Sequence, residues 1–167
     1  MTSDSLSAAR HDGGDRFLAL FLMLSMEGRR LPQRAAERQV RELIAEFFAW
    51  PSVRDASPDA VAEELTDAAA SYFQTCLTDN QYTSAMFGLR RLNAQEVRGK
   101  IARDFATTVA AVVASGTADG IGAPLLPALL AGLRQALGDG ADELARTAVA
   151  KDRAASQAAA TLWGEAC

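Results

Sequence analysis

Apolar residues recur along most of this chain at the three- and four-residue spacings of an α-helix. The clearest case lies between Pro32 and Trp50. Its apolar positions follow the i, i+4, i+7, i+8, i+11 pattern of one buried helical face and are Ala36, Val40, Leu43, Ile44 and Phe47. Proline is tolerated in the first turn of a helix but cannot continue one, so Pro32 and Pro51 predict a helix that ends near Trp50.

Residues 17–26, with the sequence FLALFLMLSM, are apolar in every direction around a helix. A helix without a polar face is normally buried, so this segment is predicted to form a central, buried N-terminal helix. Residues 1–15 are polar and mixed in charge, and are predicted to form a polar N-terminal segment. About ten apolar residues are too few to cross a bilayer, which needs roughly 20.

The middle of the chain predicts two helices with a break between them. Residues 57–59 supply a capping hydroxyl, a first-turn proline and an early carboxylate, which together favour the start of a helix. An apolar face then runs through residues 61–76. The polar run Thr78-Asp79-Asn80 interrupts this face, and residues 82–89 resume it. We therefore expect a corner at residues 78–80 between a third and a fourth helix.

Three more helices complete the prediction. Asn93 and Glu96 have the spacing of a capping box at the start of the fifth helix. Pro124 opens a sixth helix, and the glycines at 138 and 140 separate it from an alanine-rich final helix that reaches about Trp163.

Composition supports a helical fold. Alanine, the best helix former, makes up about a fifth of the residues. The fold class is therefore predicted to be all-α, a single-domain bundle of about seven helices over residues 1–167 with short loops.

Net charge and cysteine usage limit which partners and which cellular location are expected. The formal net charge of −4 argues against a general nucleic-acid binder, which needs a basic face. Cys76 and Cys167 lie far apart and do not form a disulfide framework, which favours a reducing, cytoplasmic location. The heavy use of alanine and arginine is typical of a GC-rich bacterial genome.

The sequence lacks the residues that most common catalytic sites need. Its one histidine, His11, lies in the polar N-terminal segment. Structural zinc sites and di-iron bundles need several His or Cys ligands at set spacings, so we expect no metal and no cofactor. Gly120-Ile121-Gly122 lacks the third glycine and the preceding strand of a dinucleotide-binding loop. These observations favour a protein that is not an enzyme.

The predicted corner at residues 78–80 has two interpretations. Cys76, Asp79 and Tyr82 combine a thiol, a carboxylate and a phenol within two helical turns, which is a candidate ligand-binding or catalytic pocket. In the favoured alternative, Cys76 packs as a small apolar side chain, Asp79 caps a helix end and Tyr82 packs inward.

Two groups of arginines form candidate patches for an anionic partner. The first lies along the second helix and comprises Arg30, Arg34, Arg38 and Arg41. The second lies around the start of the fifth helix and comprises Arg90, Arg91, Arg98, Lys100 and Arg103. Because Glu37, Glu42 and Glu46 alternate with the first group, solvated faces are the favoured interpretation.

Residues 105–116 and 121–133 are two apolar segments joined by a short turn. They are predicted to form a buried core hairpin, because each is shorter than the roughly 20 residues a membrane span needs. A membrane-inserting hairpin over residues 105–133 is the alternative.

Taken together, these patterns favour a non-enzymatic helical protein–protein interaction module, homo-oligomeric or a subunit of a larger bacterial assembly. One alternative is a small-ligand-binding protein or enzyme with a pocket at Cys76, Asp79 and Tyr82. The second alternative is the membrane-inserting hairpin.

Overall fold

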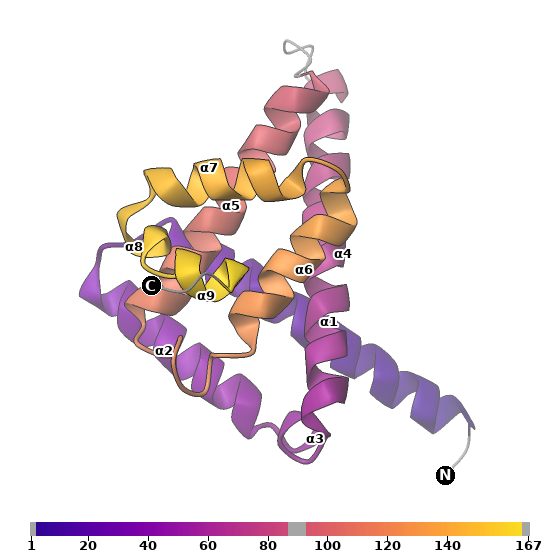
Figure 1. The fold of residues 1–167 in the computed structure, drawn as a ribbon. Coiled ribbons are helices and arrows are strands. Elements are labelled where there is room, and N and C mark those ends of the chain that lie inside the picture. Colours follow the sequence, from indigo (N-terminus) through magenta and orange to yellow (C-terminus); the bar gives the residue numbers. More distant parts are fainter. Residues whose placement is uncertain (1–2, 87–92, 165–167) are drawn as a thin grey trace.

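The computed structural model describes the backbone of residues 3–86 and 93–164, with side chains from residue 16 to 79 and from 93 to 164. Every regular element within these ranges is a helix, which confirms the all-α prediction (Figure 1). The helices are α1 (Ser3–Gly28), α2 (Arg34–Ala49), α3 (Pro51–Arg54), α4 (Pro58–Met86), α5 (Ala94–Ala114), α6 (Leu125–Leu137), α7 (Ala141–Lys151), α8 (Arg153–Ser156) and α9 (Ala159–Trp163). The described residues thus contain nine helices where about seven were predicted.

Helix α1 differs from the predicted central helix in two ways. It begins at Ser3, so the polar segment before residue 17 belongs to the same helix. It is also buried on one face only. The buried face carries Phe17, Leu20, Phe21 and Leu24, whereas Leu22, Met23 and Met26 are 46%, 47% and 61% exposed. The prediction of burial on all sides is therefore wrong.

Helix α2 follows its predicted pattern closely, since Ala36, Val40, Ile44 and Phe47 are its buried residues. The ring of Phe47 meets that of Phe17 edge to face at 4.9 Å and so joins α2 to α1. After Trp50, Pro51 does more than end α2, because it occupies the first turn of the short helix α3.

The predicted break at residues 78–80 is absent, because α4 runs without interruption from Pro58 to Met86. Thr78 donates from Oγ1 to the carbonyl oxygen of Gln74 at 3.2 Å, so its hydroxyl is satisfied within the helix. Thr78 and Asp79 are both exposed. A polar run on the solvent side of a helix needs no break, and the corner prediction is wrong for this reason.

The cap of the fifth helix is confirmed. The side chain of Asn93 accepts from the backbone N–H of Glu96 at 2.8 Å and donates to the carboxylate of Glu96 at 2.8 Å. The first bond is the N-cap half of a capping box, whereas the second joins the two side chains and does not reach the backbone N–H of Asn93.

Asp152 divides the predicted final helix. It ends α7, and its Oδ1 accepts from the backbone N–H groups of Ala154 and Ala155, each at 3.0 Å, which caps α8. The guanidinium of Arg146 on α7 lies 4.6 Å from the ring centre of Trp163, so α9 folds back against α7.

The apolar segments at 105–133 lie in the core. Phe105, Val109, Leu126 and Leu129 are at most 2% exposed, which supports the buried-hairpin interpretation. No described helix has both the length and the apolar character needed to cross a membrane.

Helices α4 and α6 make the most extensive interhelical packing and run side by side in Figure 1. Their close approach depends on Gly132 of α6. A Cβ at this position would lie 2.5 Å from the Cβ of Ala69 and 2.7 Å from the backbone nitrogen of Ala70. Only a glycine fits here without a shift of one helix.

We expect Gly132→Ala to lower the free energy of unfolding by about 1–3 kcal/mol, because overpacking outweighs the gain in helix propensity. The matched control is Gly99→Ala in α5, where a Cβ meets nothing within 4 Å. This control is expected to be more stable than the wild type by about 0.5–1 kcal/mol. Urea denaturation followed by circular dichroism measures both, and a Gly132→Ala variant as stable as Gly99→Ala contradicts the close approach.

Candidate functional site

The carboxylate of Asp104 on α5 joins three helices. Its Oδ1 accepts from Ser25 Oγ of α1 at 2.8 Å, and the guanidinium of Arg29 approaches the same oxygen at 3.4 Å. Its Oδ2 accepts a short hydrogen bond from the hydroxyl of Tyr72 on α4. The Asp104 side chain is only 13% exposed. We call this group of four residues the Asp104 junction.

Helical spacing explains how the junction forms. Ser25 lies in the last turn of α1, and Arg29 follows the helix directly, with its backbone N–H donating to the carbonyl oxygen of Ser25 at 3.2 Å, so both side chains reach the same carboxylate. Tyr72 and Cys76 are likewise one turn apart on α4. Cys76 is half-buried and, with Arg29 and Asp104, lines a hollow of about 330 Å³ beside the junction.

The environment of the junction keeps both the phenol and the thiol protonated. Burial, followed by the hydrogen bond to Asp104, raises the pKa of Tyr72 far above its ordinary value. Burial, followed by the negative charge of Asp104, raises the pKa of Cys76. The thiolate is the nucleophilic form of cysteine, so the setting suppresses reactivity at Cys76.

The structure thus places an acid and a phenol beside Cys76, but they differ from those predicted. They are Asp104 and Tyr72, whereas Asp79 is exposed on α4. The side chain of Tyr82 lies outside the described residues. The four-residue spacing of Tyr72 and Cys76 already places them one helical turn apart in the sequence. The signal for Asp104 was a carboxylate among the apolar positions Ile101 and Phe105 of a buried helix.

The members of the first arginine group make different contacts. Arg30 pairs with Glu27 at 3.7 Å, and Arg41 donates from Nε to the carbonyl oxygen of Ser115 at 2.9 Å, at the C-terminal end of α5. A cation there complements the helix dipole. Arg34 and Arg38 are exposed on α2. All four arginines are exposed, and two of them, Arg30 and Arg41, already have partners in the chain.

The members of the second arginine group also lie in different surroundings. Arg98 donates to the carbonyl oxygen of Leu137 at 2.6 Å and makes a short hydrogen bond to that of Asp139, so it caps the end of α6. Arg90 and Arg91 lie outside the described residues. Arg103 and Lys100 line a separate groove.

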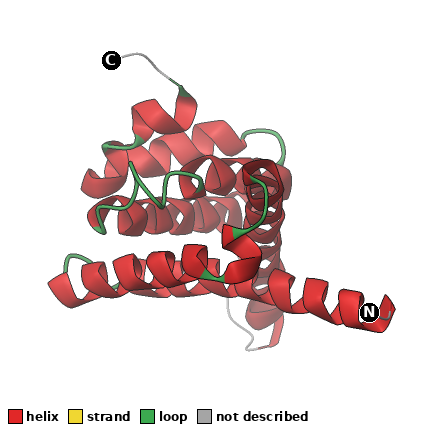
Figure 2. Cartoon of the chain, turned by 90° about the horizontal axis from the view of Figure 1, so that it is seen from below, coloured by secondary structure: helices red, strands yellow, loops and turns green. Residues whose placement is uncertain are grey.

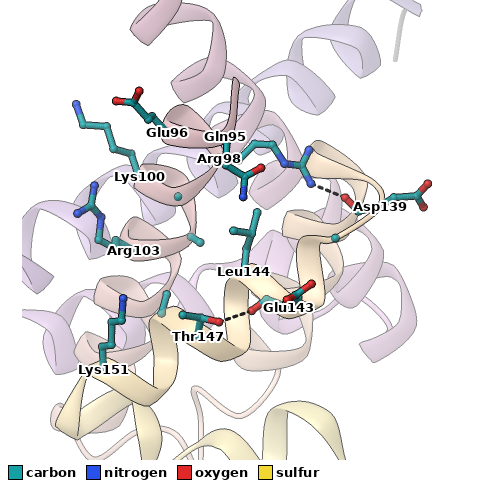
Figure 3. Close-up of a pocket in the computed structure, with 14 residues that line it drawn as sticks. Gln95, Glu96, Arg98, Lys100, Arg103, Asp139, Glu143, Leu144, Thr147 and Lys151 are labelled. Carbon is teal, nitrogen blue, oxygen red and sulfur yellow. Dashed lines mark hydrogen bonds between the residues drawn. The ribbon is translucent and has the colours of Figure 1, made fainter. Parts of the chain in front are cut away.

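This groove has a volume of about 740 Å³ and lies between α5 and α7 (Figure 3). We call it the α5–α7 groove. Residues without a charge that line it include Gly99, Ala102, Leu144 and Ala148. Its charged lining residues are Glu96, Arg98, Lys100, Arg103, Asp139, Glu143 and Lys151.

The exposed face of α1 is a third feature. Leu22, Met23 and Met26 lie within about one helical turn and on one side of α1, opposite its buried face. We call these three residues the α1 strip. The N-terminal turns of α1 continue past the body of the molecule, as both views show (Figures 1 and 2).

The chain belongs to a family of unknown function, DUF6553, whose model matches residues 5–145. The match includes the Asp104 junction and the α1 strip, and it ends within α7 before Lys151. Neither a curated protein nor a solved structure matches the chain.

We expect iodoacetamide to modify Cys76 slowly at neutral pH in a Cys167→Ser background, because the raised pKa leaves little thiolate. Asp104→Asn removes the larger of the two carboxylate contributions to that pKa and is expected to speed alkylation severalfold at pH 8. Asp79→Asn removes the smaller contribution and serves as the matched control. Mass spectrometry over time gives the rates. Rapid modification of the unaltered site, or equal effects of both substitutions, contradicts this assignment.

Proposed function

We propose that this protein is a non-enzymatic helical interaction module that forms a homodimer through the α1 strip. The observation that carries the proposal is the exposure of Leu22, Met23 and Met26 on one side of α1. Isolated exposed apolar residues are ordinary on protein surfaces, but adjacent ones on one helical face favour an interface.

The chemistry of the strip suits association. Removal of apolar surface from water contributes roughly 25 cal/mol per Å². Methionine is enriched at interfaces, and its flexible thioether adapts to the shape of a partner. Two of the three strip residues are methionines.

A second copy of the chain is the partner that the shape of α1 favours. The helix has 26 residues and is therefore about 39 Å long. In an antiparallel pair centred near Leu24, Leu22 of each copy lies level with Met26 of the other, so the strip is self-complementary. Such two-fold contacts are the commonest form of assembly.

A stable dimer would need to bury more of α1 than the strip alone. A stable interface buries about 800 Å² per partner, which is more than three side chains provide. The N-terminal turns of α1 extend past the body of the molecule (Figure 2). Pairing along the length of α1 would supply the remaining area.

The alternatives receive less support. A pocket at Cys76, Asp79 and Tyr82 required a corner that opens between two helices, and α4 is continuous there. Chemistry at the Asp104 junction is disfavoured because its carboxylate already accepts from Ser25 and Tyr72. A membrane-inserting hairpin would need to expose apolar side chains that lie in the core. The cytoplasmic and bacterial setting remains a prediction from composition.

Sedimentation velocity between 1 and 100 µM tests the proposal. We expect the wild type to sediment as a dimer and Leu22→Glu/Met26→Glu to sediment as a monomer, because two charges per copy then lie within the interface. Circular dichroism should show the same helical content for both proteins, since the two side chains are exposed.

Ile121→Glu is the matched control, because Ile121 is 47% exposed and lies in the loop before α6, away from α1 in sequence. It is expected to remain a dimer. A wild type that is monomeric up to 100 µM would rule out the homodimer. Equal disruption by Ile121→Glu would show that the α1 strip is not the interface.

A further inference from the structure

The α5–α7 groove has the size of a ligand site. Its volume of about 740 Å³ lies within the range of roughly 300–1,000 Å³ that small-molecule sites occupy. Its two sides come from helices that pack directly against each other, so they are fixed by the fold. It adjoins the hollow beside the Asp104 junction, since Lys100 and Arg103 line both.

One edge of the groove carries three cations. Lys100 and Arg103 of α5 and Lys151 of α7 extend along the same edge in Figure 3. None of the three has a hydrogen-bond or ion-pair partner among the described residues. Arg98, by contrast, is engaged by the carbonyl oxygens at the end of α6.

Within the part of the chain that the structure describes, the carboxylates that line the groove do not pair with the three cations. Asp139 and Glu143 lie on the opposite side of the groove from the three cations (Figure 3). Glu96 lies near Lys100, but its carboxylate accepts from the side chain of Asn93 at 2.8 Å as part of the α5 cap. The cationic edge therefore remains available to an anion from outside the described chain.

The glycine at position 99 also points to a ligand in the groove. Glycine within a helix is less stable than alanine by about 0.5–1 kcal/mol, so it normally has a steric reason. Gly28 and Gly132 have one, because a Cβ would lie 2.7 Å from the carbonyl oxygen of Thr107 and 2.5 Å from Ala69 Cβ, respectively. At Gly99 a Cβ meets nothing within 4 Å, and the position lines the groove. A bound molecule over Gly99 would supply the missing reason.

We propose that the α5–α7 groove binds a small organic phosphate. The phosphate lies at Lys100, Arg103 and Lys151, because guanidinium and ammonium groups are the usual partners of phosphate oxygens. The less polar body of the molecule lies over Gly99, where a Cβ would meet nothing within 4 Å.

The charge distribution favours a compact anion over a long one. With a net charge of −4, the molecule as a whole repels extended polyanions such as nucleic acids. Asp139 and Glu143 on the far side would repel charge spread across the groove and accept hydrogen bonds from donors on the body of the ligand. A single phosphate at one end fits this asymmetry.

Isothermal titration with AMP, inorganic pyrophosphate and adenosine tests the inference. AMP is expected to bind with a dissociation constant on the order of 1 mM or tighter, and adenosine, which lacks the phosphate, at least about tenfold more weakly. Pyrophosphate is expected to compete with AMP, because both need the cationic edge.

Two variants locate the site. Lys100→Gln/Arg103→Gln is expected to weaken AMP binding by about tenfold or more through loss of two cations. Gly99→Phe is expected to abolish AMP binding, because a Cβ at this position meets nothing within 4 Å and the ring it carries would take the space of the ligand in the groove. Circular dichroism checks that both variants are folded. Arg34→Gln/Arg38→Gln, which removes two exposed arginines of α2, is the matched control and should bind AMP normally.

The inference is overturned if AMP gives no binding at 5 mM. It is also overturned if the Arg34→Gln/Arg38→Gln control weakens binding equally, since the effect would then reflect overall charge. Binding of pyrophosphate without AMP would contradict the organic body. These outcomes are separate from the test of dimerisation, because no residue of the groove belongs to the α1 strip.

Discussion

An ionised carboxylate that is largely removed from water must receive hydrogen bonds from the protein, because an unpaired buried charge costs several kcal/mol. Asp104 lies on α5 where α1 and α4 meet it, and it receives these bonds from Ser25, Tyr72 and Arg29. Apolar packing alone allows helices to rotate or slide with modest change in energy. The directional bonds of Asp104 restrict this freedom, since each donor comes from a fixed position on its own helix.

The orientation that results determines which faces are left exposed. With Ser25 directed towards Asp104, the Leu22 and Met26 side of α1 faces away from the core. With Asp104 directed towards α1 and α4, the side of α5 that carries Gly99 lines the groove beside α7. The proposed dimer surface and the proposed phosphate groove thus involve α1 and α5, two helices that this polar contact joins. Their roles remain distinct, because one is apolar and the other cationic.

Local features of this fold were predictable from the sequence, and contacts between helices were not. The apolar face of α2 and the N-cap at Asn93 depend on spacings within one helix, so the local sequence was enough to find them. The run at residues 78–80 was misjudged because polar residues indicate a break and a solvated helix face equally well. Tyr72 and Cys76 lie one turn apart on α4, a spacing that the sequence contains, but their acidic partner is Asp104, on another helix. Periodicity contains no information about which helices meet, and the exposed side of α1 was missed for the same reason.

The claim that Asp104 couples α4 to α5 is tested most directly by a double-mutant cycle of Tyr72→Phe and Asp104→Ala. The free energy of unfolding of the wild type, both single variants and the double variant is measured in urea. Hydrogen bonds to charged groups are worth about 1.5–3 kcal/mol, and residues that share one network show coupling of a similar size. We predict a coupling energy of about 1–3 kcal/mol between the two positions. Single effects that add within about 0.5 kcal/mol would contradict the account, because they would mean that the carboxylate and the phenol stabilise the protein independently.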